Sequence, residues 1–349
     1  MCDRIETHRG LQIFKELLAI PTPSGHETAM ARHLVARLEA LGLAPEMDPA
    51  GNVSIRLPGI DSERPSICYA AHIDEIGASV TRIDNGELHV RRLGGLFPWK
   101  IGESPVSILG DHETIGGMLS LGSGHSRTVV ERGATWEGAR VMTGRSASSL
   151  SKAGVRVGSP VVPDRSVCGP FVFGEPKSPW IGAWTFDNRL AVACFLEALE
   201  RMRDQSLEPR SPTTLAFTVE EEIGCLGAKV FAQRERPDVF IAVDGSPLVP
   251  ECPVSLDGSP GIRSRDRMAT YDQELLLEIC EISSQAGVTM QPVVYEGAAS
   301  DASAVYSVGA SPRVACFGYV RASSHGYEVT PLRTFDQITD SMLALLAAL

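Results

Sequence analysis

The sequence predicts an α/β protein in which a mixed-sheet catalytic domain is interrupted by a small β-rich domain. Four segments, residues 65–71, 214–219, 239–243 and 313–320, are predominantly apolar, as in strands buried on both faces of a sheet. Helical patterns separate most of these runs, which is typical of α/β proteins. Between about residues 81 and 173, short apolar runs instead alternate with Gly, Ser and Pro, and no long amphipathic helix occurs. We therefore expect an inserted β-rich domain in this region.

The composition fits a large folded chain and excludes several classes of partner. With 349 residues, of which 43% are apolar, the chain can bury a large core. A formal net charge of −11 argues against nucleic acids and anionic membranes, because both require a basic surface. No secretory signal is visible, and the longest apolar tract, residues 342–349, is too short to span a bilayer. The eight cysteines form no C-x-x-C pair, which favours a reducing compartment and predicts a cytoplasmic location.

Two helices are expected before the first buried strand. The first carries apolar residues at helical spacing, namely Leu11, Phe14, Leu17 and Leu18, and ends at the prolines of residues 21–23. Ser24 and Glu27 then match a capping box, in which the serine caps the next helix and the glutamate reaches back to the backbone. That second helix has an apolar face and ends before Gly42.

Polar residues that can bind a metal ion follow the predicted buried strands. In chain order the candidates are His72, Asp74, Asp187, Glu221, Glu222, Asp244 and His325. All of them follow predicted strands except Asp187, which lies at a predicted helix start. Ligands of open α/β sheets gather at the carboxyl ends of the strands, so we expect these side chains to meet at one edge. Asp187 is the residue at the helix start, and a capping role explains its position equally well.

The chemistry of this set indicates a catalytic metal centre. Two histidines with several carboxylates and no thiolate suit zinc, cobalt or manganese. They are too many ligands for one open catalytic ion and fit two ions bridged by one carboxylate. Glu221 is left over beside a ligand and is the natural general base, while Asp74 can orient the imidazole of His72. A run of three glutamates is by itself usually solvated surface, so the interpretation depends on the partner residues.

Further motifs cover most of the chain. They are residues 23–27, 51–52, 72–77, 94–95, 154–158, 187–189, 221–224, 227–228 and 243–244, and His325 with Glu328. In this order they resemble the M42 family of dinuclear metallo-aminopeptidases, a branch of the zinc-peptidase clan that includes glutamyl and leucyl aminopeptidase-like enzymes. The expected activity is the hydrolysis of N-terminal residues from short peptides.

The resemblance implies a division of roles at the site. One ion would be held by His72, Asp187 and Asp244, and the other by Asp187, Glu222 and His325. Asp187 would be the bridge, Glu221 the base and Asp74 the residue that orients the site. The ions would be two divalent metals per subunit, zinc or alternatively cobalt or manganese. Residues 73–171 would form the domain through which subunits pair, within a catalytic domain of residues 1–72 and 172–349, and the homo-oligomer would be a dimer or a dodecamer.

Three departures from the family pattern leave every proposed ligand in place. Glu220 replaces a usual Gln, residues 141–146 replace an Ile-Asp-x-Gly-Ala stretch, and His325 is followed by Gly-Tyr. Asp301 receives no role from its sequence context.

Two alternative functions are an M20-type deacylase or carboxypeptidase and a catalytically silent assembly protein. The β-rich insertion before Asp187 favours M42, because the M20 insertion usually lies later in the chain. The complete set of ligands and base disfavours the silent protein. No basic residue is evident at the site to receive a C-terminal carboxylate, which favours an aminopeptidase.

Overall fold

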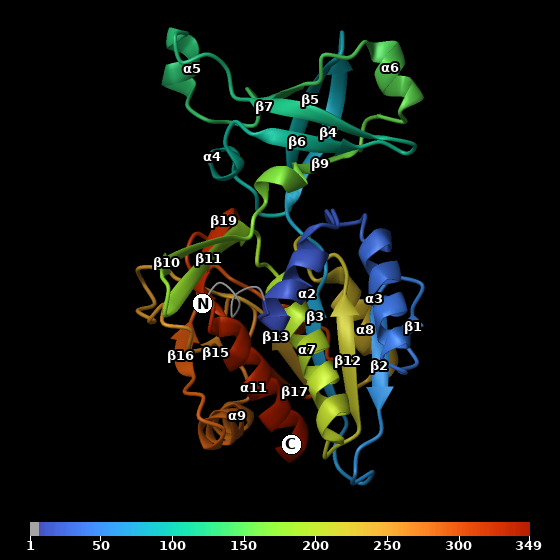
Figure 1. Cartoon of the computed structure of the whole chain (residues 1–349), viewed down its shortest axis with the longest axis vertical. Helices are drawn as coiled ribbons and strands as arrows, with labels where there is room; N and C mark the ends of the chain where they lie inside the picture. The colour runs from blue at the N-terminus through green and yellow to red at the C-terminus, as the bar shows by residue number, and fades with distance from the viewer. Residues whose placement is uncertain (1–6) are drawn as a thin grey trace.

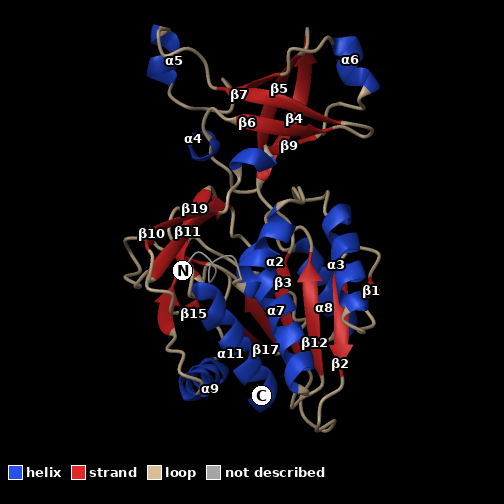
Figure 2. Ribbon diagram, in the orientation of Figure 1, coloured by secondary structure: helices blue, strands red, loops and turns tan. Residues whose placement is uncertain are grey.

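The structure, a computed structural model, describes residues 7–349 and is built around an eight-stranded mixed sheet (Figures 1 and 2). The strand order is β1-β2-β12-β3-β13-β17-β15-β16. In chain order the strands are β1 (Glu46–Met47), β2 (Val53–Leu57), β3 (Ile67–His72), β12 (Thr213–Thr218), β13 (Val239–Val243), β15 (Gly261–Arg265), β16 (Gln291–Val294) and β17 (Arg313–Gly318). The mixed α/β class predicted from the sequence is confirmed.

The four apolar runs form the parallel centre of this sheet. Strand β3 pairs in parallel with β12 and β13, and β13 pairs in parallel with β17. Every residue of β3 and β13 is buried, as expected for strands covered on both faces. Thr218, the last residue of β12, lies opposite His72, the last residue of β3. The polar residues that follow these strands therefore start from the same edge of the sheet.

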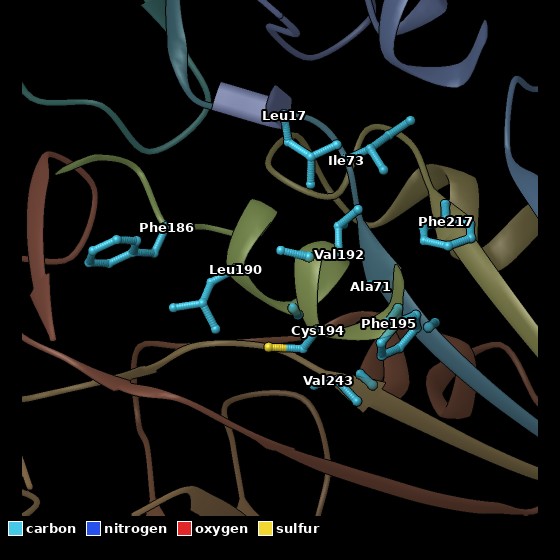
Figure 3. Close-up of a cluster of buried hydrophobic side chains, with 14 of the residues drawn as sticks. Leu17, Ala71, Ile73, Phe186, Leu190, Val192, Cys194, Phe195, Phe217 and Val243 are labelled. Atoms are coloured by element: carbon cyan, nitrogen blue, oxygen red, sulfur yellow. The ribbon is translucent and has the colours of Figure 1, made fainter. Parts of the chain in front are cut away.

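Helix α7 (Arg189–Gln205) is buried over most of its length, and α2 (Arg9–Leu18) and α11 (Thr334–Ala348) pack against it. Figure 3 shows part of this core, in which Phe195 of α7 lies near Phe217 of β12, with ring centroids 6.0 Å apart. The other helices are α3 (Thr28–Ala40), α4 (Pro98–Ile101), α5 (Arg127–Arg132), α6 (Ala147–Lys152), α8 (Leu226–Glu235), α9 (Gln273–Gln285), α10 (Asp301–Ser307) and the 3-10 turn η1 (Arg165–Val167). Within residues 7–349, no helix combines the length and apolar character needed to cross a membrane.

A closed six-stranded antiparallel barrel interrupts the α/β part between β3 and β11 and stands apart from the large sheet (Figure 1). Its strands are β4 (Gly77–Asp84), β5 (Glu87–Leu93), β6 (Pro105–Leu109), β7 (Thr114–Ser120), β8 (Arg140–Met142) and β9 (Pro160–Pro163), in the spatial order β4-β5-β8-β7-β6-β9. The side chains of Leu88, Val90 and Ile108 are buried in it. Closure pairs the edges that short strands would otherwise leave free.

Two small sheets connect the barrel side of the molecule to the functional residues. Strands β10 (Phe171–Glu175), β11 (Ser178–Trp184) and β19 (Tyr327–Pro331) form an antiparallel sheet. Strands β14 (Ser246–Pro247) and β18 (Val320–Arg321) form a parallel pair. Strand β11 ends three residues before Asp187, and the loop between β18 and β19 carries His325. Because β11 pairs with β19, the three-stranded sheet brings the segments that carry Asp187 and His325 together.

The capping box predicted for Ser24 and Glu27 is wrong. Helix α3 begins at Thr28, and its N-cap residue Glu27 makes no side-chain capping bond. The Glu27 carboxylate instead accepts hydrogen bonds from the backbone N–H groups of Gly25 and Glu220, and the Ser24 hydroxyl donates to Asp74. Both side chains serve tertiary contacts, which outweigh the local motif.

Glu75 joins the barrel to the α/β part through one buried and one partly buried ion pair. It lies just before β4 and accepts hydrogen bonds from Arg165, which follows the barrel, and from Arg189 at the start of α7. Burial alone would raise the pKa of Glu75, but the charges of Arg165 and Arg189 outweigh it and lower that pKa to about 2. The carboxylate is therefore charged in the folded protein at all ordinary pH values.

We expect Glu75→Gln to destabilise the fold by about 3–5 kcal/mol, because it leaves the buried guanidinium of Arg189 and the partly buried one of Arg165 short of a counter-charge. Urea unfolding at neutral pH measures this loss, and Glu39→Gln on the exposed side of α3 is the control. Since the folded pKa lies below the ordinary 4.5, the contribution of Glu75 is present above pH 4.5 and is lost as the pH falls towards 2. The difference between variant and parent should therefore shrink in acid, and a difference that grows there contradicts the assignment.

Candidate metal centre

The candidate site lies at the edge of the large sheet that faces the barrel (Figure 1). His72 ends β3, Glu221 and Glu222 follow β12 by three and four residues, and Asp244 directly follows β13. Asp187 precedes α7 by two residues, so it lies outside the helix and is not its N-cap, which is Asn188. Parallel strands that end in register thus bring residues from distant parts of the chain to one place.

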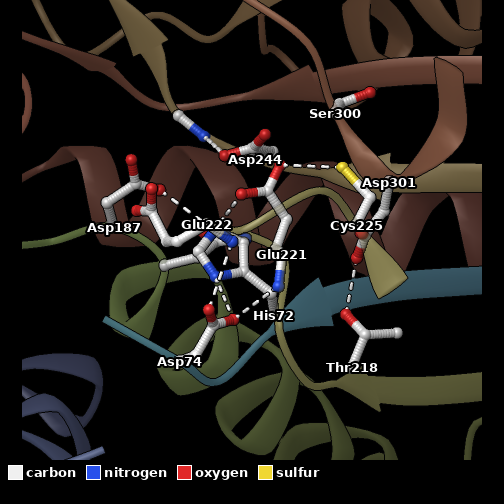
Figure 4. Close-up of polar contacts among 12 residues, drawn as sticks. His72, Asp74, Asp187, Thr218, Glu221, Glu222, Cys225, Asp244, Ser300 and Asp301 are labelled. Carbon is white, nitrogen blue, oxygen red and sulfur yellow. Dashed lines mark hydrogen bonds and ion pairs between the residues drawn. The ribbon is translucent and has the colours of Figure 1, made fainter. Parts of the chain in front are cut away.

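Asp187 lies between the two histidines. Its Oδ1 is 3.2 Å from Nε2 of His72, and its Oδ2 is 3.7 Å from Nε2 of His325. Glu222 completes the group, with Oε2 3.6 Å from Nε2 of His325. His72, Asp187 and Glu222 each offer one ligand atom within 4.8 Å of the others (Figure 4). A cation at this place could be bound by both nitrogen and oxygen ligands.

Asp74 contacts His72 and the turn that carries Glu221 and Glu222. It lies 3.3 Å from Nδ1 of His72, on the opposite side of the ring from Asp187. Its two oxygens also accept hydrogen bonds from the backbone N–H groups of Glu221 and Glu222, at 2.9 and 3.1 Å. The Ser24 hydroxyl donates a further bond at 2.6 Å. One carboxylate therefore fixes the imidazole and the turn that carries both glutamates, which is how outer residues orient metal ligands.

The Glu221 carboxylate lies beside the group formed by His72, Asp187 and Glu222 and does not belong to it. Its Oε2 is 4.0 Å from Nε2 of His72, and its Oε1 accepts a hydrogen bond from the Cys225 thiol at 3.4 Å. Asp301 lies on the same side, where the Thr218 hydroxyl donates to it at 2.5 Å. Burial raises the pKa of Asp301 to about 6. The sequence flagged Asp301 without a role and did not single out Cys225.

Two buried arginines that the sequence analysis missed pair with the acidic residues. Arg263 on β15 donates to Oδ2 of Asp244 at 3.2 Å. Arg321, the last residue of β18, donates to Asp187 and to Oε1 of Glu328. The interpretation that no basic residue lies at the site is therefore wrong. For Arg321 the available signal was an arginine directly after an apolar run, where a buried charge requires a partner. Arg263 lies in a strand with two arginines and gives no such signal.

The Arg321 guanidinium occupies the space above Gly245. A Cβ atom built on Gly245 would lie only 1.2 Å from Nη1 of Arg321, so this position has room for glycine alone. Glu328 also accepts hydrogen bonds from the backbone N–H groups of Asp187 and His325, at 3.1 and 3.0 Å. Arg321 and Glu328 together fix the two segments that carry these side chains.

The barrel contributes one wall of the site. After β5, the carbonyl of Gly95 lies 3.2 Å from Nδ1 of His325. A Cβ on Gly95 would lie 2.5 Å from the same nitrogen, and one on Gly94 would lie 3.2 Å from the Cβ of Glu222. This close approach needs both glycines. A side chain at position 95 would collide with His325, and one at position 94 would crowd Glu222.

The electrostatics of the group fit a divalent cation. Burial raises the pKa of Glu222 well above its usual range, and the charge of Asp187 raises it further. Burial also raises the pKa values of Glu221 and Asp244. Among the described residues, Oε1 of Glu222 is buried without a hydrogen-bond partner. A cation would both compensate the crowded negative charge and occupy the free oxygen, so the residues present fit a metal ion.

Comparisons with known proteins identify the family to which this chain is similar. A family model described as M42 glutamyl aminopeptidase matches residues 51–340. Among curated proteins, the glutamyl aminopeptidase of Lactococcus lactis subsp. cremoris is 30% identical over 67% of this chain and 65% of its own length. The lysyl aminopeptidase of Pyrococcus furiosus is 25% identical over 67% of this chain and 65% of its own length.

Solved structures share the fold at lower identity. The TET aminopeptidase of a marine-sediment thaumarchaeon superimposes with a TM-score of 0.87, at 22% identity, over 99% of this chain and 97% of its own. The TET1 peptidase of Pyrococcus horikoshii, which can assemble into a tetrahedron or a large octahedral shell, gives a TM-score of 0.85 at 22% identity, over 97% of this chain and 100% of its own.

Proposed function

The chain belongs to the M42 family of peptidases, and from this premise we propose that it is a dinuclear metal-dependent aminopeptidase acting on short peptides. The observation that carries the proposal is the position of Asp187 between His72 and His325, with Glu222 beside them. A carboxylate with each oxygen directed at a different imidazole is suited to bridging two ions.

We assign the ligands as the family pattern suggests. His72, Asp187 and Asp244 would hold one divalent ion, and Asp187, Glu222 and His325 the other. Zinc, cobalt and manganese all suit such nitrogen and oxygen ligands. Arg263 and Arg321 reduce the cost of burying Asp244 and Asp187 as charged groups.

The side chains then divide the work of peptide hydrolysis. Bound ions would polarise the scissile carbonyl and lower the pKa of the attacking water. Glu221 accepts the proton of that water and passes it to the leaving amine, because its carboxylate lies beside His72 but outside the ligand group. Asp74 keeps His72 in the orientation that directs Nε2 at Asp187.

Release of the N-terminal residue from aminoacyl-nitroanilides and short peptides tests the proposal. Zinc, cobalt or manganese should activate the protein, and a chelator should remove the activity. Release from the C-terminus instead, or deacylation of blocked substrates, would replace the proposal with an M20-type hydrolase. A protein that binds no ion and cleaves nothing would be the silent assembly protein.

Cleavage is expected to require a free α-amine. The acidic groups at the site can pair with an ammonium, whereas Arg263 and Arg321 are buried and already engaged by Asp244, Asp187 and Glu328. A hydrogen bond to a charged group contributes about 1.5–3 kcal/mol, so acetylation should lower kcat/KM by about 10–100-fold. The measurement compares one peptide with and without its acetyl group. Equal rates on the two would contradict this part of the proposal.

We also propose that residues 73–171 act as a domain through which subunits pair, with residues 1–72 and 172–349 as the catalytic domain. Supporting this, Met118 and Met142 are cross-strand partners on the barrel, and each is about half exposed. Exposed apolar neighbours of this kind often mark an interface. The location is proposed to be the cytoplasm.

The protein should form a dimer at least, and a dodecamer if it assembles as the TET relatives do. Light scattering at micromolar concentration measures the mass, which should be a multiple of 37.4 kDa. Met142→Glu should reduce the mass, because it places a charge in the proposed interface, while Thr81→Glu on the exposed part of β4 serves as the control. A fully active parent protein that is monomeric would show that the barrel has another purpose.

A further inference from the structure

A second group of potential ligands lies beside Glu221, on the side away from His72. Glu221, Cys225 and Asp301 each offer one ligand atom, and these three atoms lie within 4.8 Å of one another (Figure 4). They come from the turn after β12, from the residue before α8 and from the first residue of α10. Cys225 and Asp301 are only 4% and 3% exposed. The roles assigned above to the catalytic site use neither of them.

Asp301 has one oxygen that nothing in the described chain satisfies. The Thr218 hydroxyl donates to Oδ2, but Oδ1 is buried without a hydrogen-bond partner among residues 7–349. Leaving a buried carboxylate oxygen unpaired is costly, and native structures rarely do so without a reason. Asp301 belongs to a cluster that also contains a thiol and a second carboxylate, and these groups together form a set of cation ligands.

We propose that Glu221, Cys225 and Asp301 form a third cation site, selective for thiophilic divalent ions such as zinc, cadmium and cobalt. In tetrahedral geometry, a zinc ion about 2.3 Å from sulfur and about 2.1 Å from oxygen separates these atoms by roughly 3.6 Å. Sγ of Cys225 is 3.4 Å from Oε1 of Glu221, close to that spacing. The sulfur ligand distinguishes this site from the nitrogen and oxygen ligands around Asp187, and it favours softer ions.

Binding has a simple chemical balance. The Cys225 thiol releases its proton to solvent as the bond from sulfur to the ion forms, and both carboxylates bind in their charged form. The hydrogen bond from Cys225 to Glu221 is lost, and the ion takes the place of that proton. No oxidant or further reactant is required.

Occupation of this site would inhibit the enzyme, a consequence that rests on the proposed role of Glu221. A carboxylate bound to an ion through Oε1 no longer accepts a proton readily, so excess zinc should lower kcat after the two catalytic ions are in place. The binding itself does not depend on the peptidase activity and is tested separately.

The test is absorption spectroscopy of the full-length protein titrated with cobalt beyond two equivalents per subunit. A bond between cobalt and thiolate gives a charge-transfer band in the near ultraviolet, which ligands of nitrogen and oxygen do not produce. The band should appear in the parent and in Cys280→Ser, whose thiol is half-buried on α9. It should be lost in Cys225→Ser, which preserves the size of the side chain. A parent without the band, or a Cys225→Ser protein that retains it, overturns the proposal.

The cobalt concentration that saturates the third site gives a second measurement, which does not require Cys225 to be replaced. Asp301→Asn keeps the thiol but removes one charge, so saturation of the third site should need at least about tenfold more cobalt than in the parent. Unchanged saturation overturns the role of Asp301. If the parent shows the Cys225-dependent band but cleaves no peptide under any condition, the proposed function fails and the third site stands. If the parent has normal peptidase activity but shows no band, the proposed function stands and the third site fails.

Discussion

Glu221→Gln is expected to lower kcat by about 10²–10⁴-fold while the protein, supplied with two equivalents of metal per subunit, keeps the two proposed catalytic ions. The amide has the shape of the carboxylate and can still accept the hydrogen bond from Cys225, but it cannot take a proton from water. Steady-state kinetics combined with metal analysis of the purified variant provides the measurement.

Glu222→Gln is the matched comparison, because it changes the neighbouring glutamate in the same way. Oε2 of Glu222 lies 3.6 Å from His325 in the ligand group, so this variant should lose metal as well as activity. If Glu221→Gln keeps a near-parental kcat with full metal content, Glu221 is not the base. If both variants lose metal equally, the division between ligand and base is wrong.

Asp187→Ala should abolish activity and release at least one ion per subunit. The reason is that Asp187 contacts His72 through one oxygen and faces His325 through the other, so both proposed ion positions depend on it. Asp187→Asn, which preserves the volume of the side chain, should give the same result if charge is the cause. Metal analysis after gel filtration, together with activity, measures both effects.

Asp266→Asn controls for the loss of a buried carboxylate. Asp266 accepts a hydrogen bond from the Tyr271 hydroxyl at 2.6 Å and belongs to neither cluster of potential metal ligands. This variant should keep both catalytic ions. An Asp187→Ala protein that holds two ions as tightly as the parent would leave Asp187 with a structural role only.

The fold could be predicted largely because buried strands have a clear pattern. The apolar runs that end at His72 and before Asp244 form neighbouring parallel strands, so the residues after them start from one edge of the sheet, where ligands of such sheets bind. The closed barrel could not be deduced, because strand order and closure depend on pairing between runs that look alike in sequence. What the sequence supplied there was only the β-rich composition.

Site residues that directly follow the buried strands could be predicted from the sequence. Site residues that lie on other strands and contact the site through tertiary packing could not. Arg321 and Arg263 approach Asp187 and Asp244 from other strands, and their pairing depends on tertiary contacts that no spacing reveals. The sequence around Ser24 predicts a local cap, but the Ser24 hydroxyl donates to Asp74, 50 residues away. Local motifs fail in such cases because a buried acidic partner competes for the same side chain.

The close contact between Gly245 and Arg321 has a consequence for the paths that evolution or mutagenesis can take. With Arg321 present, even alanine at position 245 would clash with the guanidinium, so this substitution should be strongly deleterious. Once residue 321 is shortened, the same alanine should become far less harmful, so the cost of the substitution depends on a position 76 residues away in sequence (magnitude epistasis). A library that varies both positions would recover non-glycine residues at 245 only together with small residues at 321.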